Sequence, residues 1–354
     1  MTKRSYILLK FIPPFAGIIL ITTGLIIYPT QTAEGIKKGL FLLGDNIIPS
    51  LFPFMVLSSY VSNSSTIDLL AKFLEKPAQK VFRISGNGSI AVILGLLGGY
   101  PIGAKTTAEF LKKGKLTPNE ANRLLYWCVN PGPAFVITAV GSFMLSDLKI
   151  GIILYVSNIF SALLMGFCSR FFSNKQKLGD YIPKYENKKD VFVKSVSSGS
   201  EAMLGICGWV LTFSAIAALG NQIISSENIN IFLNTILEVT TGCTYAVKYN
   251  LPLPIISAIL GFGGFAVIFQ IRNYMEICNV SLKNFLCIRI LNGALSAFFC
   301  SQLMKFFPES VSVFSQINAG NTVFHLSHSV SASFILIVMC TVFIFEVDNK
   351  RKMC

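Results

Sequence analysis

The sequence LGLLGGYPIGAKTTAEFLKKGKLTPNE, residues 94–120, begins as a membrane-spanning helix does and then departs from that pattern. Within a few residues the apolar run meets two glycines, a tyrosine, a proline, a further glycine and Lys105. Glycine adopts left-handed backbone angles at little cost, and a tight reversal of the chain requires such angles. We therefore predict that the chain turns back at Gly98–Gly99 as a re-entrant helical hairpin, whose second arm covers residues 103–115.

The composition of the chain indicates an integral membrane protein. Of its 354 residues, 53% are hydrophobic and only 13% are charged, whereas soluble domains carry about a quarter charged residues. The net charge of +13 would suit a nucleic-acid-binding protein, but the Lys and Arg residues form blocks between apolar segments. Cytoplasmic loops of polytopic membrane proteins have this pattern. We expect a lipid bilayer around the chain and no nucleic-acid partner.

Several apolar segments have about the 20 residues that a helix needs to cross a bilayer core of ~30 Å. We expect an all-α polytopic membrane protein with about seven or eight transmembrane helices. The longest polar run, residues 172–194, divides the chain into two halves. The expected spans are 11–28, 46–62, 121–144, 149–171, 198–220, 284–306 and 326–347.

The two halves resemble each other at a near-constant offset. ILGLLGGYPIGAK (93–105) matches ILGFGGFAVIFQ (259–270), and VNPGPAF (129–135) matches LNGALSAF (291–298). The constant order of these matches indicates an internal duplication. The expected organisation is an N-terminal membrane helix at 1–30, a first repeat at 31–172, a cytoplasmic basic linker at 173–197, a second repeat at 198–347 and a tail at 348–354.

Each half is predicted to carry two interruptions. One is a re-entrant hairpin, at 89–114 and again at 252–279, and the other is a discontinuous helix, broken at 130–133 and at 292–293. Proline opens the hydrogen-bond ladder of a helix, and lipid cannot satisfy the freed backbone groups, so such breaks line a cavity. Secondary transporters build midplane sites from paired breaks in inverted repeats. Close helix packing at small residues is the simpler alternative, but the duplication favours a transporter.

Three stretches resemble a known family: IIPSLFPFMVLSSYV (47–61), GLLGGYPIGAK (95–105) and EANRLLYWCVNPGPAFVITAVGSFML (120–145). They are similar to the YlbJ family of sporulation integral membrane proteins, also called SpoVV, which carry a nucleoside-recognition Gate domain. The resemblance implies a fold related to concentrative nucleoside transporters, with inverted repeats, two hairpins and two discontinuous helices. It also implies transport of a small organic anion, dipicolinate during spore formation. The expected location is then a bacterial cell membrane, the mother-cell-derived one around the forespore.

The candidate substrate-binding residues lie at the glycine tips and the helix breaks. Helix N-termini exposed there favour carboxylates, and Lys105 is a candidate counter-charge for an anion. Alternatively, Lys105 belongs to an arm that already reaches the headgroups, or it pairs with Glu109 at i,i+4. The candidates are Gly98, Gly99, Tyr100, Pro101, Gly103, Lys105, Asn130, Pro131, Gly132, Gly263, Gly264, Gln270, Asn292 and Gly293.

Other polar residues support no further site. Glu201 and Glu238 lie near the ends of apolar segments, where an interfacial position is favoured over proton coupling. His325 and His328 lack a third ligand, so we expect no metal. No catalytic constellation and no cofactor motif occurs, so we expect no enzyme. A non-transporting sporulation assembly protein and a nucleoside-type carrier are the alternative functions, and a homo-oligomer is left open.

The topology of the second half is open between two arrangements. The positive-inside rule places the N-terminus and the basic blocks up to residue 194 in the cytoplasm. If residues 252–279 form a re-entrant hairpin, the chain has seven spans, its repeats are inverted and its C-terminus is outside. If 252–271 crosses fully, there are eight spans and the C-terminus is inside. The duplication favours seven spans.

Overall fold

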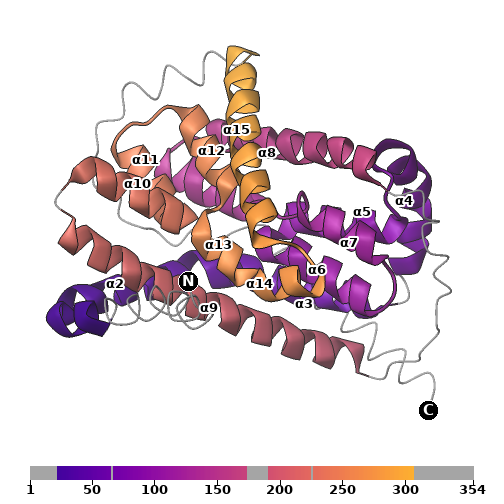
Figure 1. Cartoon of the computed structure of the whole chain (residues 1–354), viewed down its shortest axis with the longest axis horizontal. Helices are drawn as coiled ribbons and strands as arrows, with labels where there is room; N and C mark the ends of the chain where they lie inside the picture. The colour runs from indigo at the N-terminus through magenta and orange to yellow at the C-terminus, as the bar shows by residue number, and fades with distance from the viewer. Residues whose placement is uncertain (1–21, 65–66, 174–189, 225, 307–354) are drawn as a thin grey trace, which may run out of the picture.

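The structure is a computed structural model that describes residues 22–64, 67–173, 190–224 and 226–306. All regular structure in these ranges is helical, which confirms the predicted all-α class (Figure 1). The predicted spans 326–347 and most of 11–28 lie outside the described residues, as do His325 and His328.

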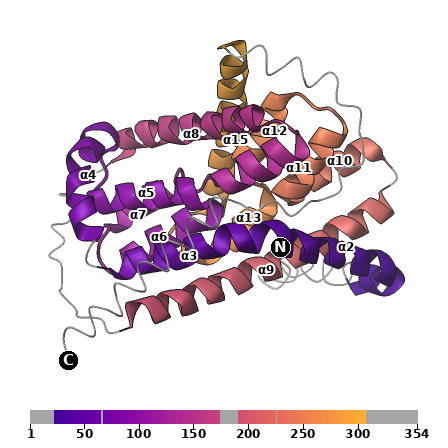
Figure 2. The ribbon, with the colours of Figure 1, turned by 180° about the vertical axis from the view of Figure 1, so that it is seen from behind.

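A long pair of helices runs along one side of the molecule (Figure 2). One member consists of α2 (Pro29–Leu42), a π-helical turn (Leu43–Ile47) and α3 (Ile48–Asn63), and the other is α9 (Val191–Ile223). The pair is antiparallel, because Gly35 lies against Ser214 whereas Gly199 lies against Val56. Small residues at these contacts allow the backbones to approach closely.

The chain reverses where LGLLGGYPIGAK predicts it. Helix α4 (Ile67–Phe82) leads into α5 (Gly86–Gly98) through a bend of 86°, and α6 (Tyr100–Lys112) then folds back along α5. Gly99 makes the turn with φ 101° and ψ −178°. Gly95 and Gly103 face each other on the two arms, since a Cβ added at Gly103 would be 3.0 Å from the Gly95 Cα. The reversal is observed, and its re-entry into a bilayer stays a prediction.

The first predicted helix break is also present. Helix α7 (Pro118–Leu125) ends before Tyr126, and the π-helix η2 (Ala134–Met144) starts after Pro133. Between them the chain through Pro131 is not helical, as the missing backbone donors of two prolines require. Helix α8 (Leu148–Ser169) and a short 3-10 turn (Arg170–Phe172) complete the first half.

The second half is a more continuous set of helices. Helices α12 and α15 pack side by side and contact α8 (Figure 1). The elements are α10 (Glu227–Leu237), α11 (Val239–Lys248), α12 (Leu253–Phe262), α13 (Gly264–Gln270), α14 (Arg272–Ile277) and α15 (Leu282–Phe306).

The expectation of a second hairpin at 252–279 is wrong. Helices α12 and α13 form one apolar segment, Leu253–Gln270, that is long enough to cross a membrane. Gly263 has φ 83° and ψ −13°, a left-handed conformation that ends α12. Helix α13 begins at the next residue and continues the same apolar segment. At Gly99, by contrast, the extended ψ directs the chain away, and Pro101 starts a new helix. The repeats therefore differ at this point.

The expectation of a second discontinuous helix is also wrong. Asn292 and Gly293 lie inside α15, which is helical from Leu282 to Phe306. No proline occurs in this helix, so every residue can donate to its ladder, and glycine alone lowers helix stability by only about 1 kcal/mol.

Four described segments are long and apolar enough to cross a membrane, or five if the bent pair Leu69–Phe82 and Gly86–Gly98 counts as one. The chain is therefore an integral membrane protein, although the predicted number of seven or eight spans is not reached within the described residues. The continuous segment at 253–270 favours the eight-span alternative over the inverted second hairpin. The four are Leu148–Phe172, Val191–Ile223, Leu253–Gln270 and Leu282–Phe306.

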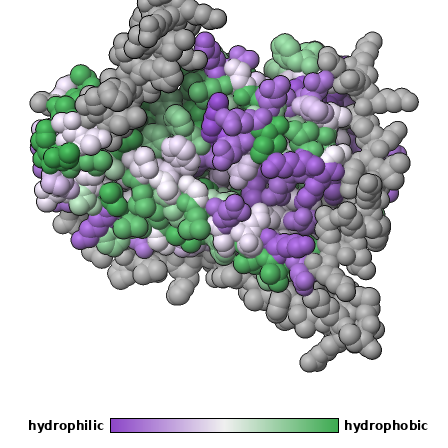
Figure 3. Space-filling model, turned by 60° about the horizontal axis from the view of Figure 1, so that its bottom comes forward, coloured by the Kyte–Doolittle hydropathy of each residue, from purple (hydrophilic) through white to green (hydrophobic). Residues whose placement is uncertain are grey.

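Three of the basic blocks meet at one end of the molecule. Arg123 donates from Nη2 to the Arg83 carbonyl at 2.6 Å and from Nη1 to the Ser169 carbonyl at 3.0 Å, and Arg170 donates to Val81 at 3.2 Å. This common location agrees with the positive-inside argument. Figure 3 shows a face of the molecule on which hydrophilic residues gather right of the centre, whereas hydrophobic residues predominate on the left.

Candidate functional site

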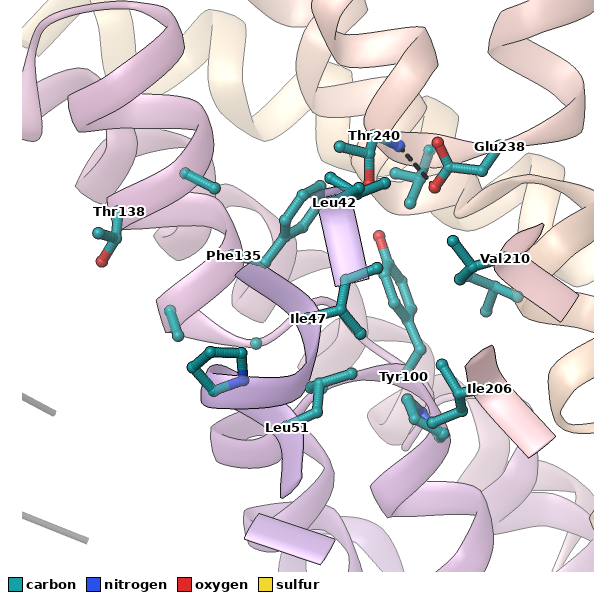
Figure 4. Close-up of a pocket in the computed structure, with 18 of the residues that line it drawn as sticks. Leu42, Ile47, Leu51, Tyr100, Phe135, Thr138, Ile206, Val210, Glu238 and Thr240 are labelled. Carbon is teal, nitrogen blue, oxygen red and sulfur yellow. Dashed lines mark hydrogen bonds between the residues drawn. The ribbon is translucent and has the colours of Figure 1, made fainter. Parts of the chain in front are cut away.

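The hairpin tip and the helix break open onto one cavity of about 200 Å³, here called the tip cavity (Figure 4). Its walls come from both halves of the chain, since the π-helical turn Leu43–Ile47 contributes together with α6, η2, α9, α11 and α13. The lining is mainly apolar with a few polar groups. It includes Ile47, Leu51, Gly99, Tyr100, Pro101, Gly132, Phe135, Thr138, Ile206, Val210, Glu238, Thr240 and Gln270.

Three helices begin at the wall of the tip cavity. Helix α6 begins at Tyr100, η2 at Ala134 and α11 at Val239. The N-terminus of a helix carries a partial positive charge and free backbone N–H groups. Neither α6 nor η2 has a side-chain cap, so two uncapped N-termini face the same space. An anion is the ligand that such an arrangement favours.

Gly99 and Gly132 bring the hairpin tip and the broken segment together backbone to backbone. A Cβ added at Gly99 would lie 3.3 Å from the Gly132 nitrogen, and one added at Gly132 would lie 3.2 Å from the Gly99 nitrogen. Gly99 also has a positive φ of 101°, which other residues adopt only with strain. Glycine at both positions keeps the two helix starts adjacent.

Tyr100 crosses the tip cavity and connects the two halves of the chain. Figure 4 shows its ring standing between Ile47 and Val210. The Tyr100 hydroxyl donates a hydrogen bond of 2.7 Å to the Leu260 carbonyl of α12. The Arg289 guanidinium lies over the ring, 5.7 Å from its centroid. The tip is therefore fixed against the second half from two directions.

Arg289 is a site residue that the sequence reasoning missed. It is 1% exposed, and it donates from Nε to the Phe262 carbonyl at 2.9 Å and from Nη1 to the Val129 carbonyl of the broken segment. Its Nη2 has no hydrogen-bond partner among the described residues. The available signal was an arginine inside the apolar segment 284–306, because such residues are rare in spans and usually functional.

Glu238 caps α11 at the cavity wall. Its Oε1 accepts from the Thr240 nitrogen at 3.0 Å, and its Oε2 accepts from the Thr241 nitrogen at 2.6 Å and the Thr241 hydroxyl at 2.9 Å. The residue is 4% exposed and lies at the wall of the tip cavity. Its carboxylate neutralises the α11 N-terminus and leaves those of α6 and η2 available.

A second cavity of about 400 Å³, here called the charged cavity, adjoins the tip cavity. Lys105 reaches it and is only 3% exposed. The Lys105 ammonium lies 3.6 Å from Glu109 Oε1, as the i,i+4 alternative predicts, and also donates to the Ser59 hydroxyl. The other lining includes Glu109, Lys112, Ser198, Glu201, Ile206, Trp209, Gln270, Asn273 and Tyr274.

The predicted site residues divide into two groups. Six of them line a cavity: Gly99, Tyr100, Pro101, Lys105, Gly132 and Gln270. The other eight do not: Gly98, Gly103, Asn130, Pro131, Gly263, Gly264, Asn292 and Gly293.

The packing alternative describes most residues of the second group. A Cβ added at Gly103 would overlap the Cys128 carbonyl, and one added at Gly293 would lie 2.8 Å from the Ala258 carbonyl. Asn292 joins three helices, because its Nδ2 donates to the Gly261 carbonyl at 2.9 Å and its Oδ1 accepts from the Ser161 hydroxyl at 2.6 Å. These residues hold neighbouring helices together and do not line either cavity.

The described residues contain no group of three His, Cys, Asp or Glu side chains placed to hold a metal ion. The polar groups of the two cavities are helix N-termini, hydroxyls and amides together with charged side chains. The charged ones are Asp45 and Glu238 in the tip cavity and Lys105, Glu109, Lys112 and Glu201 in the charged cavity. These groups suit the binding of a small polar solute.

These features define a helical integral membrane protein with a cavity at a broken helix and a chain reversal. Residues 46–173 match the Gate family, described as nucleoside recognition. Across 331 residues it is 24% identical to the sporulation integral membrane protein YlbJ of Bacillus subtilis (strain 168), an alignment that covers 81% of each chain. The chain is therefore a relative of a sporulation membrane protein. No solved structure matches it.

Proposed function

We propose that this protein is a membrane transporter that moves a small organic anion through the tip cavity. The observation that carries the proposal is the pair of uncapped helix N-termini, α6 and η2, that face one cavity beside Gly99 and Gly132. Unwound backbone in a membrane protein is stable where it lines a cavity, and transporters place such helix ends at their substrate sites.

The cavity suits a planar carboxylate. The partial positive charge of its two uncapped helix N-termini favours an anion, and Tyr100 and Phe135 present aromatic rings to the bound solute. Its volume of about 200 Å³ limits the cargo to a small molecule. Dicarboxylates of an aromatic ring, dipicolinate among them, are the substrate class that we propose. The site of action would be the membrane around the forespore, given the sporulation relative.

Uptake by reconstituted proteoliposomes tests the proposal. Labelled dipicolinate, a straight-chain dicarboxylate and uridine are compared in the same vesicles. We expect uptake of the aromatic dicarboxylate, reduced severalfold in Gly132→Val, because the added side chain would separate the two helix starts. Gly208→Val is the matched control, since Gly208 is exposed on α9 with open space around it.

The other outcomes identify the competing functions. The Gate description, nucleoside recognition, favours a nucleoside carrier as the second candidate, and uridine uptake without dicarboxylate uptake would support it. Uptake of no solute by a monodisperse protein would contradict transport and favour an assembly role in the sporulation membrane.

A further inference from the structure

The tip cavity and the charged cavity share part of their lining. Pro101 of α6, Ile206 of α9 and Gln270 of α13 border both. A wall whose residues border a space on each side is one side chain thick. We propose that the two cavities are consecutive compartments of one solute path, and that Ile206 and Gln270 close against Pro101 as the gate between them. What passes the gate rests on the proposed function, whereas the existence of the gate does not.

The three residues differ in how freely they move. Proline has a fixed ring, and Pro101 is buried in the first turn of α6. Isoleucine in a helix keeps one strongly preferred rotamer, and Ile206 is 4% exposed. Glutamine has three side-chain torsions, and Gln270 is the last residue of α13, just before the chain leaves helical geometry at Ile271. Gln270 is therefore the moving part, and Ile206 with Pro101 forms the fixed frame.

The chemistry of Gln270 fits an anion path. Its amide is half-buried and has no hydrogen-bond partner among the described residues. An amide N–H₂ can donate to a carboxylate in either of the two cavities that this wall separates. Beyond it, Lys105 offers a buried ammonium in the charged cavity. A carboxylate leaving the tip cavity thus meets a neutral donor first and then the Lys105 ammonium, which shares the charged cavity with Glu109 and Glu201.

A native fluorophore, Trp209, lies beside the proposed gate. Trp209 lines the charged cavity and stacks on Phe269, next to Gln270, with ring centroids 5.4 Å apart. The chain has two tryptophans. The other, Trp127, is 2% exposed against Phe82. A Trp127→Phe variant therefore leaves one reporter beside the gate.

Cysteine labelling in sealed vesicles tests the gate without any substrate. Thr138→Cys marks the tip cavity and Ser198→Cys the charged cavity, each in a full-length background without native cysteines, and a charged, membrane-impermeant thiol reagent is applied from either face. We expect each cysteine to react from one face only, and from opposite faces. Ile206→Ala should raise labelling from the wrong face by about tenfold, which corresponds to a barrier lowered by about 1.4 kcal/mol.

Two neighbours serve as controls. Met203→Ala removes an equally buried side chain from α9 that borders neither cavity, and Asn273→Ala changes a residue of the charged cavity alone. We expect neither to cause labelling from the wrong face, whereas Gln270→Ala does. In the Trp127→Phe background we expect Trp209 emission to shift in Ile206→Ala, because Trp209 lines the charged cavity. Native-like thermal unfolding in detergent serves as the sign that the fold is retained.

Two results would overturn the gate. One is that the cysteines still react from one face only in both Ile206→Ala and Gln270→Ala, while thermal unfolding is native-like. The other is an equal effect of Met203→Ala. Either result would leave the uptake assay valid, so failure of the gate and failure of the transport proposal are distinguishable.

Discussion

The Tyr100 hydroxyl donates to the Leu260 carbonyl at 2.7 Å, and this bond joins the tip of the first-half hairpin to the second-half helix α12. The donor and the acceptor are 160 residues apart in the chain. The tip of the hairpin is therefore positioned by tertiary structure, although its turn is local.

Removing this hydroxyl should destabilise the protein. Tyr100→Phe leaves a buried carbonyl without its partner, which costs about 1–3 kcal/mol, and we expect the free energy of unfolding in detergent to fall by that amount. Tyr155→Phe is the matched control, because the Tyr155 hydroxyl donates to the Leu96 carbonyl at 3.0 Å within one half of the chain. Its loss should affect stability without affecting uptake. Equal loss of uptake in both variants would show that uptake falls through lost stability and not through a specific role of Tyr100 in the site.

The Glu238 cap should contribute to both stability and transport. Glu238→Ala frees the N-terminus of α11, and loss of a helix cap costs about 0.5–2 kcal/mol. Because α11 begins at the wall of the tip cavity, we also expect anion uptake to change. The measurements are thermal unfolding and the apparent KM for the anion.

Asp147 provides the comparison for Glu238. It caps α8 with the same pattern, since its carboxylate accepts from the Lys149 and Ile150 nitrogens, but it borders neither cavity. Asp147→Ala should lower stability by a similar amount and leave KM unchanged. A KM that shifts equally in both variants would mean that the effect on uptake is only structural.

Lys105 is expected to act on the substrate anion as well as on Glu109. Lys105→Gln removes the buried ammonium of the charged cavity and should reduce dicarboxylate uptake far more than protein abundance. Lys112→Gln, an exposed residue of the same cavity, should have a smaller effect because solvent screens its charge. Parallel loss of uptake and abundance in Lys105→Gln would indicate a folding defect instead.

The continuous segment Leu253–Gln270 gives a prediction about topology. If it crosses the membrane once, the chain has eight spans, and the C-terminus returns to the side of the N-terminus. A reporter enzyme fused after Cys354 should then be active in the cytoplasm. Activity on the outer side would instead support seven spans and a second re-entrant segment.

The sequence predicted features that arise from local backbone chemistry. Gly99 and Pro101 impose the reversal, and Pro131 with Pro133 imposes the break, since these residues act on their own backbone. The second half was wrongly predicted because Gly263–Gly264 and Asn292–Gly293 resemble their counterparts in letters but lack the proline. Without it, α15 stays helical through Asn292–Gly293. At Gly263–Gly264 one helix ends and the next begins, but the two remain one apolar segment and the chain does not reverse.

Other parts of the site depend on contacts between distant segments. Arg289, Ile206 and Glu238 come from three different helices and reach the tip through packing. Periodicity and motifs report on neighbours in sequence, so they could mark Arg289 as unusual in an apolar segment but could not show that its partner is Val129.

The bond from Arg289 to the Val129 carbonyl also spans 160 residues, and this has a consequence for biogenesis. When the break around Asn130 enters the membrane, the residue that satisfies it has not yet been synthesised. Until then, the Val129 carbonyl of the nascent chain lacks its Arg289 donor, and the Tyr100 hydroxyl lacks its acceptor at Leu260. The broken segment therefore completes this contact only after translation has passed Arg289.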